Sequence, residues 1–304
     1  MNKSIKFLSL ILCLIIITSV SGCTKYEFGE EGNYIVSAKE ALEQIKNGAI
    51  LVDVQSFDNY KNSHIEGAIN IPMSSLVVNE PYDNMLPSKD IVETVMSEAG
   101  IKETDLLLLY DNNDNMQAAR VQWTLEIYGN KNTKVVSGGI KALQDKGANT
   151  STEIVTLSPS TYKTSERDNT LIVNLDYINA LMNNPNENVI IVDTRSAEEF
   201  SQGTIPTSKF IEYKINNYAT GEYKSPRDIK LTYLDEGIKP ENRIIVFCKT
   251  SVRAAQTYSA LKNAGFMDVR VYDGAWLEYS ANNAPSVQQS DTNIVPSAGD
   301  GSWF

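Results

Sequence analysis

The chain has 304 residues and a formal net charge of −11, from 27 basic and 38 acidic side chains. An acidic balance of this size argues against nucleic acid as a partner, and an anionic substrate must then be attracted by a local group of basic residues. The length is sufficient for two domains of ordinary size.

The N-terminal segment has the pattern of a bacterial export signal. Two lysines precede an apolar run over residues 7–20, which has the length of a signal-peptide core and is short for a membrane span. The stretch VSGC at residues 20–23 resembles a lipobox, whose cysteine is diacylated and becomes the first residue of the mature protein. We therefore predict a signal peptide over residues 1–22 and a lipid on Cys23, which would hold the chain on the outer face of the bacterial cytoplasmic membrane. A plain secretory signal and an uncleaved anchor are the alternatives.

The rest of the chain contains an internal repeat. Three short segments of the first half have similar counterparts, in the same order, in the second half. The matching pairs are residues 49–55 and 189–195, 64–68 and 204–208, and 106–111 and 244–248. Two copies of one structural unit are therefore predicted.

The predicted elements alternate between apolar strands and helices. Ser37 and Glu40 form the pattern of a capping box at a helix start, and Asn174 can cap a helix that runs through Leu181. Continuous apolar strands between helices predict an α/β fold in which each parallel sheet is covered by helices on both faces. The predicted boundaries are a first domain over residues 33–148, a linker over 149–168, a second domain over 169–284 and a loose tail over 285–304.

Cys248 is the one thiol that remains, because Cys13 leaves with the signal peptide and Cys23 is consumed by the lipid. No disulfide and no cysteine-based metal site is then possible within one chain, and we predict neither a metal nor a cofactor. Cys248 lies between a strand-like run over residues 243–247 and a helical pattern over 254–264.

That position favours a reactive thiolate. Backbone amides converge at the start of a helix, the helix dipole is positive there, and Lys249 and Arg253 add charge. The alternative is a buried structural cysteine.

Together these motifs resemble the tandem rhodanese family of thiosulfate and 3-mercaptopyruvate sulfurtransferases, over almost all of the mature chain. The resemblance is carried by Asp53 with the signature at residues 63–72, by residues 110–129, by residues 193–195, by the Cys248 loop and by residues 272–276. It implies two rhodanese-like domains, of which the first has lost its cysteine, with Asp111 in its place, and the second is catalytic.

The resemblance also implies the chemistry of a thiosulfate sulfurtransferase. The Cys248 thiolate would attack the outer sulfur of thiosulfate or 3-mercaptopyruvate, become a persulfide, and pass the sulfur to cyanide or a thiol. By family analogy, glycine at position 249 suits mercaptopyruvate and a basic residue suits thiosulfate, so Lys249 favours thiosulfate. Backbone amides from Lys249 to Arg253 would stabilise the anionic sulfur.

Other residues of the expected site have two interpretations each. Arg253 contacts the donor or braces the loop by pairing with Asp193 or Glu199, and Arg195 is a pocket residue or a structural partner. The remaining expected pocket residues are Thr250, Ser251, Val252 and Trp276. The hydroxyls of Thr250 and Ser251 donate to the sulfur species or satisfy the loop's own backbone, and Trp276 walls the pocket or belongs to the core.

Three residues depart from the family pattern. Thr204 replaces the usual histidine, Ser251 occupies a position that is commonly glycine, and Glu199 stands where members acting on thiosulfate often carry a donor-binding arginine. The departures at Thr204 and Ser251 leave a low-turnover sulfur carrier or surface binding module as the main alternative function.

Other functions fit the sequence less well. Cysteine phosphatases place five residues between cysteine and arginine, whereas four separate Cys248 from Arg253. The single histidine, His64, lies in the other copy, which argues against a cysteine protease. The stretch at residues 111–115 begins like a calcium loop but lacks its later ligands, so a solvated loop is expected there.

Overall fold

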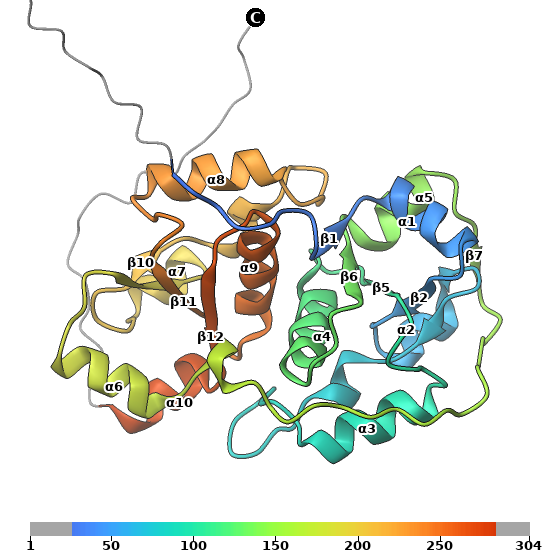
Figure 1. Ribbon diagram of the computed structural model, residues 1–304, viewed down its shortest axis with the longest axis horizontal. Helices are drawn as coiled ribbons and strands as arrows, with labels where there is room; N and C mark the ends of the chain where they lie inside the picture. The colour runs from blue at the N-terminus through green and yellow to red at the C-terminus, as the bar shows by residue number, and fades with distance from the viewer. Residues whose placement is uncertain (1–25, 284–304) are drawn as a thin grey trace, which may run out of the picture.

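The computed structural model describes residues 26–283, which form two α/β halves side by side (Figure 1). Each half contains one five-stranded sheet, and every strand pair in both sheets is parallel. The predicted signal peptide over residues 1–22, the lipid site at Cys23 and the tail over 285–304 lie outside the described residues. None of the helices in residues 26–283 has both the length and the apolar character needed to cross a bilayer.

The first half contains a sheet with strand order β1-β6-β5-β2-β4 and a short antiparallel pair of β3 with β7. Its elements are β1 (Ile35–Val36), α1 (Ala38–Lys46), β2 (Ile50–Asp53), α2 (Phe57–Asn62), β3 (His64–Ile65), β4 (Ile69–Asn70), η1 (Met73–Leu76), α3 (Lys89–Glu98), β5 (Leu107–Tyr110), α4 (Met116–Ile127), β6 (Thr133–Val136), α5 (Gly139–Asp145) and β7 (Thr150–Ser151).

The second half contains a sheet with strand order β10-β9-β11-β12-β8. Its elements are η2 (Asn169–Leu171), β8 (Ile172–Val173), α6 (Leu175–Asn183), β9 (Val189–Asp193), α7 (Ala197–Ser201), β10 (Lys209–Phe210), η3 (Tyr213–Asn216), α8 (Pro226–Asp235), β11 (Arg243–Phe247), α9 (Val252–Asn263), β12 (Asp268–Tyr272) and α10 (Ala275–Asn282).

The two sheets have one topology, which confirms the predicted repeat. Read from the opposite end, the second order is β8-β12-β11-β9-β10, so β5 and β11 are the central strands of equivalent sheets. The register agrees as well, because Asp53 pairs with Tyr110 at the end of β5 and Asp193 pairs with Phe247 at the end of β11. The carboxyl ends of parallel strands are where ligands bind in open α/β sheets. In both halves this edge carries the loop after the central strand.

Both predicted helix caps are confirmed. The Ser37 and Glu40 side chains form a reciprocal capping box at α1. The Asn174 side chain accepts the amide of Tyr177 at the start of α6. Each contact satisfies a backbone N–H that the first helical turn cannot pair internally.

The helix after Cys248 begins earlier than the sequence pattern indicates. It starts at Val252 and not at Ala254, because Ser251 takes the left-handed conformation (φ 66°) and ends the loop there. Arg253 therefore belongs to the first turn of α9. Gly265 follows the helix with φ 86°, and its lack of a side chain also allows the Gly29 carbonyl to approach, since a Cβ there would lie 2.7 Å from that oxygen.

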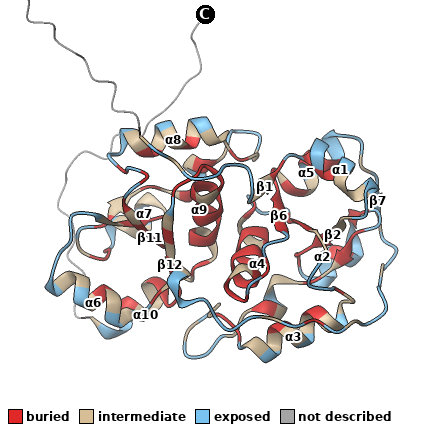
Figure 2. Cartoon of the chain, in the orientation of Figure 1, coloured by how far each residue is buried: buried red, intermediate tan, exposed pale blue. Residues whose placement is uncertain are grey.

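The two halves share one hydrophobic core, in which α4 and α9 face each other at the centre of the molecule (Figures 1 and 2). Both helices are buried along most of their length. The Ser259 hydroxyl donates to the side-chain Oε1 of Gln122 at 2.7 Å, and the Tyr258 hydroxyl donates to the half-buried Glu126 carboxylate at 3.0 Å. Burial is the largest cause of the raised pKa of Glu126, which the hydrogen bonds from two tyrosines oppose. Contacts between the halves are thus apolar and polar, and the loops that α4 and α9 follow lie near this interface.

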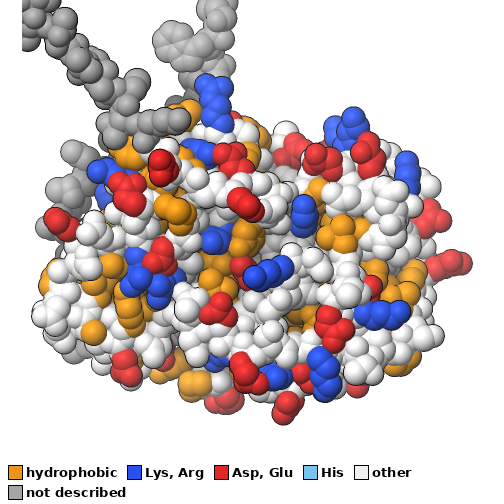
Figure 3. Space-filling view, in the orientation of Figure 1, with side chains coloured by type: hydrophobic (Ala, Val, Ile, Leu, Met, Phe, Trp, Pro, Cys, Tyr) orange, Lys and Arg blue, Asp and Glu red, His pale blue; other side chains and the backbone are white. Residues whose placement is uncertain are grey.

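The segment predicted as a linker runs along the first half. β7 pairs with β3, the Val155 amide donates to the Tyr60 hydroxyl at 3.0 Å, and Tyr162 is buried. On the face shown in Figure 3, acidic and basic side chains are interspersed and apolar ones are scattered.

Candidate active site

Cys248 directly follows β11, the central strand of the second sheet. It is 1 % exposed and belongs to the shared hydrophobic core. It is the free cysteine of the described residues. Its position at the carboxyl end of the sheet, immediately before α9, is the one that the sequence predicts for it.

The short loop after Cys248 is hydrogen-bonded to the end of β12 and to α10. The Trp276 amide donates to the Cys248 carbonyl at 2.9 Å, and the Leu277 amide donates to the Lys249 carbonyl at 3.3 Å. The Ser251 hydroxyl donates to the carbonyl oxygens of Tyr272 and Asp273. These contacts hold the loop against the end of β12 and the start of α10.

Ser251 has a backbone conformation that usually requires glycine. Its φ of 66° costs an L-residue about 1–2 kcal/mol. The buried hydroxyl offsets this cost, because its one hydrogen is shared between the backbone carbonyls of Tyr272 and Asp273. Serine in place of glycine therefore strains the backbone at this position but adds a side-chain hydrogen bond that holds the loop.

The equivalent loop of the first half holds an anion. Asp111 directly follows β5, and its carboxylate accepts the amides of Asn113 at 2.8 Å, Asn115 at 3.1 Å and Ala118 at 2.9 Å. Burial raises the pKa of Asp111, and these amide hydrogen bonds oppose the rise. The expectation of a solvated loop is wrong for Asp111 and Asn115, which are buried, because the carboxylate turns inward to satisfy the amides at the start of α4. Such a set of converging amides is an anion cradle.

Arg253 braces the Cys248 loop against α7. Its guanidinium donates to both Glu199 carboxylate oxygens, at 2.5 and 2.8 Å. The hydrogen bonds from Arg253 lower the pKa of Glu199 to about 2. Burial lowers the pKa of Arg253, but Glu199 and the charge of Cys248 outweigh it and leave that pKa raised. Glu199 therefore holds Arg253 in the first turn of α9, directly after the Cys248 loop.

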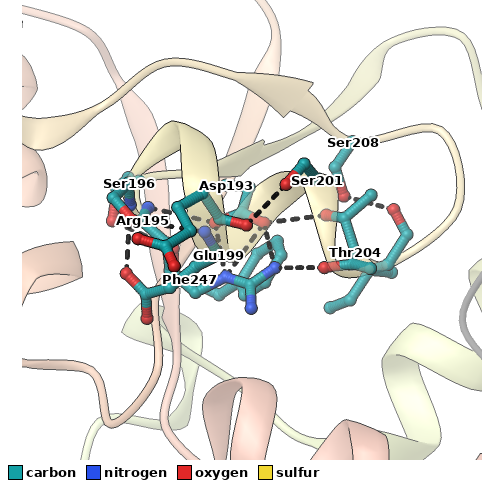
Figure 4. Close-up of polar contacts among 12 residues, drawn as sticks. Asp193, Arg195, Ser196, Glu199, Ser201, Thr204, Ser208 and Phe247 are labelled. Carbon is teal, nitrogen blue, oxygen red and sulfur yellow. Dashed lines mark hydrogen bonds and ion pairs between the residues drawn. The ribbon is translucent and has the colours of Figure 1, made fainter. Parts of the chain in front are cut away.

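Arg195 is buried and paired with Asp193 (Figure 4). Its Nε lies 2.9 and 3.1 Å from the two carboxylate oxygens and its Nη2 lies 2.6 Å from the second. The guanidinium also lies 4.3 Å from the Trp276 ring centroid, in cation–π geometry. Thr204 donates to Asp193 at 2.8 Å, so the residue that replaces the usual histidine completes this cluster. The cluster joins the end of β9, the segment after α7, and α10.

The remaining loop residues differ in exposure. The Lys249 side chain is exposed and has no ion pair within residues 26–283, whereas Thr250 and Val252 are half-buried. The Thr250 hydroxyl accepts a hydrogen bond at 3.2 Å from Asn84, a residue of the first half.

The first half contributes residues next to the Cys248 loop that the sequence alone did not assign to the site. The Leu86 amide donates to the Asp273 carboxylate at 3.0 Å. Arg120, on α4, donates to Asp273 at 3.3 Å and to the Asn84 carbonyl at 2.5 Å. An arginine within an otherwise small and apolar helix face, at residues 118–121, is the signal that could have indicated them.

A protein-family comparison matches the chain twice. The family model described as "Rhodanese-like domain" matches residues 37–146 and residues 174–282. The first match spans Asp111 and Arg120, and the second spans Cys248 and its loop.

Curated relatives align over most of the chain. A Mycobacterium bovis protein provisionally named a thiosulfate sulfurtransferase is 27% identical over 239 residues, which cover 73% of this chain and 84% of the relative. A Mycobacterium leprae protein with the same kind of name is 27% identical over 266 residues, 81% of this chain and 94% of the relative. A Schizosaccharomyces pombe protein provisionally named a 3-mercaptopyruvate sulfurtransferase is 26% identical over 282 residues, 84% of this chain and 95% of the relative.

Solved structures agree in fold. The anaerobic ergothioneine biosynthesis enzyme from Chlorobium limicola, in complex with trimethyl histidine, superposes with a TM-score of 0.75 at 19% identity, over 86% of this chain and 71% of that one. Wild-type EanB superposes with a TM-score of 0.73 at 20% identity, over 84% of this chain and 69% of that one.

Proposed function

The chain belongs to the rhodanese-like family, with two copies of the domain, and on that premise we propose that it is a sulfurtransferase that carries sulfane sulfur on Cys248. Relatives that align over most of their length have names that denote the same class of reaction. The finer assignment to thiosulfate and to a persulfide intermediate is supported by the geometry around Cys248.

The cycle has two half-reactions. The Cys248 thiolate attacks the outer sulfur of thiosulfate, a new S–S bond forms, and the bond to the sulfonate sulfur breaks, so that sulfite leaves with the electron pair. Cyanide or a thiolate then attacks the outer sulfur of the persulfide, takes that sulfur, and returns the Cys248 thiolate. No external oxidant or reductant is needed, and the protein has to hold negative charge on sulfur in both states.

The observation that carries this proposal is the repeat itself. The loop after β5 binds a carboxylate with three amides at the start of α4. The equivalent loop after β11 also ends in a left-handed residue at a helix start, and Cys248 stands where Asp111 stands. A thiolate or persulfide would therefore meet amides of the same kind.

The donor is proposed to be thiosulfate. Lys249 is exposed at the loop and has no carboxylate partner among the described residues, so it can attract a dianion as a point charge. 3-Mercaptopyruvate is the second donor to test, since one relative is named for it.

A low-turnover sulfur carrier is the second candidate, and the burial of Cys248 favours it. At 1 % exposure the sulfur can react only when the halves or the loops around it open. A carrier would form the persulfide and release it slowly.

The test is a thiocyanate assay on the purified protein with thiosulfate and cyanide. We expect sustained turnover, a gain of one sulfur atom on the Cys248 peptide by mass spectrometry, and loss of both in Cys248→Ser. A stable persulfide with negligible turnover would support the carrier. Hydrolysis of an aryl phosphate without thiocyanate would support a phosphatase and reject the proposal.

We also propose that the protein is anchored by a lipid on Cys23 at the outer face of the cytoplasmic membrane. The support is the sequence pattern of residues 1–23. Cells fed a labelled fatty acid should label the wild-type chain and not Cys23→Ala; equal labelling of the two would reject the anchor.

A further inference from the structure

Arg120 is a fully buried guanidinium that the first half places at the Cys248 site. It lies on α4, the helix that follows Asp111, and is 0 % exposed. Asp273, its acidic partner, lies in the second half between β12 and α10. The contact between them therefore crosses the interface of the two halves.

The hydrogen bonds of Arg120 are incomplete. Its Nη2 donates to the Asn84 carbonyl at 2.5 Å and to one Asp273 oxygen at 3.3 Å. Its Nε and Nη1 are buried and have no partner within residues 26–283. A guanidinium has five N–H donors, and each buried donor without an acceptor costs about 1–3 kcal/mol. The Arg120 guanidinium carbon also lies 4.6 Å from the centroid of the Trp123 ring, in a cation–π contact.

Both partners of Arg120 also hold the Cys248 loop. Asn84 donates through its side chain to Thr250 at 3.2 Å, and the Asp273 carbonyl accepts the Ser251 hydroxyl. Burial lowers the pKa of Arg120, while the charges of Asp273 and Cys248 oppose that change. The shared partners Asn84 and Asp273 place the Arg120 side chain next to the Cys248 loop.

The other arginines of the site are already neutralised. Arg195 has two close contacts with Asp193, and Arg253 is held by both oxygens of Glu199. Glu199 also occupies the position where the resemblance leads one to expect a donor-binding arginine. Arg120 has one 3.3 Å contact to a carboxylate, and its buried Nε and Nη1 have no acceptor among the described residues.

We propose that Arg120 binds the oxygens of an anionic oxo-sulfur donor such as thiosulfate and stabilises the sulfite that leaves. This inference rests on the proposed sulfur transfer and names the donor class of the same site. Such a ligand would supply acceptors to the free N–H groups, and charge-assisted hydrogen bonds of guanidinium to oxyanions are among the strongest in proteins. The first half then supplies a donor-binding residue to the cysteine of the second.

The test compares Arg120→Met and Arg120→Lys with wild type in the full-length protein. Arg243→Met is the matched control, because Arg243 is also paired with an aspartate but lies at the opposite end of β11. Two readouts are measured: KM and kcat for thiosulfate, and the ratio of Cys248 alkylation rates with anionic iodoacetate and neutral iodoacetamide.

We expect Arg120→Met to raise KM for thiosulfate at least about tenfold and to lower the iodoacetate/iodoacetamide ratio at least about threefold, with Lys between and the control unchanged. A merely structural role would change both alkylation rates together and leave the ratio constant. An unchanged KM and ratio in a folded Arg120→Met protein would overturn the inference.

A second measurement does not depend on the folding of that variant. In Cys248→Ser protein, the Nε–H signal of Arg120 in a ¹H–¹⁵N spectrum should shift on titration with thiosulfate or sulfite; no shift at saturation would overturn the inference. Failure of the proposed function is a separate outcome. The wild-type protein can make no thiocyanate while its preference for iodoacetate over iodoacetamide is lost in Arg120→Met. That result would reject sulfur transfer and support Arg120 as an anion-binding residue.

Discussion

Asp111 and Cys248 occupy equivalent positions in the two halves, each directly after the central strand of its sheet and before a left-handed residue that starts a helix. In the first half, the side chain at this position is an anion that the loop's own amides bind. In the second half, it is a thiol. The two copies therefore differ in the side chain that stands at this position, a carboxylate in the first and a thiol in the second.

The first prediction is that Asp111→Asn destabilises the protein by about 1–3 kcal/mol. The amide that replaces one carboxylate oxygen donates hydrogens, so it would face backbone N–H groups such as that of Ala118, which the native carboxylate accepts at 2.9 Å. The free energy of unfolding is measured by urea titration.

Asp145→Asn is the control for this change. Asp145 is exposed and makes a surface pair with Lys141, which is worth a few tenths of a kcal/mol. If both variants unfold at the same urea concentration, the amide cradle of Asp111 contributes nothing to stability.

The sequence predicted the architecture well because its signals are local. Apolar runs ending in aspartate mark the buried strands, and caps such as Ser37 and Asn174 mark helix starts. The position of Cys248 between a strand and a helix follows from the same patterns. These features depend on neighbours within a few residues of each other.

The contacts that the first half makes at the Cys248 site could not be predicted in this way. Arg120 meets Asp273 across 153 positions of the chain, and Asn84 meets Thr250 across 166. No periodicity connects such residues, since the contacts arise only when α4 packs against α9. The inward turn of Asp111 was missed for another reason: the polar run at residues 111–115 has the composition of an exposed loop, and the convergence of amides decides its position.

The second prediction separates the backbone and side-chain roles of Ser251. Ser251→Ala keeps the left-handed strain and loses the hydroxyl contacts with Tyr272 and Asp273, so we expect a loss of about 1–3 kcal/mol and slower sulfur transfer. Ser251→Gly loses the same contacts but relieves the strain, so it should be about 1 kcal/mol more stable than the Ala variant. Thermal unfolding of the three proteins checks this order. An Ala variant as stable as the Gly variant would show that φ at this position is not strained.

The third prediction concerns acid stability through Glu199. Its pKa is about 2 in the folded protein against an ordinary value of 4.5, chiefly because of Arg253. A lowered carboxyl pKa contributes stability that is present above pH 4.5 and is lost as pH falls toward 2. The stability difference between wild type and Glu199→Gln should therefore be constant above pH 4.5 and vanish in acid. Glu198→Gln, an exposed change in the same helical turn, should show no such dependence.

The fourth prediction is that Lys249→Ala raises KM for thiosulfate about fivefold with little change in kcat. In water, two unit charges about 4 Å apart attract by on the order of 1 kcal/mol, and a dianion doubles this value. Screening by salt reduces the sum to about 1 kcal/mol, which corresponds to this factor. Because Lys249 acts as a screened point charge, the effect should shrink as ionic strength rises. Lys239→Ala, an exposed lysine before β11, should leave KM unchanged.

The preference between sulfur donors is expected to depend on residue 249 as well. If the charge of Lys249 selects thiosulfate, then Lys249→Gly should lower the preference for thiosulfate over 3-mercaptopyruvate, measured as the ratio of the two kcat/KM values. The Gly and Ala variants share the loss of charge, so an effect seen in both is electrostatic, whereas a change confined to Gly comes from loop flexibility. Equal ratios in wild type and both variants would remove Lys249 from donor binding and leave selection to buried groups of the site.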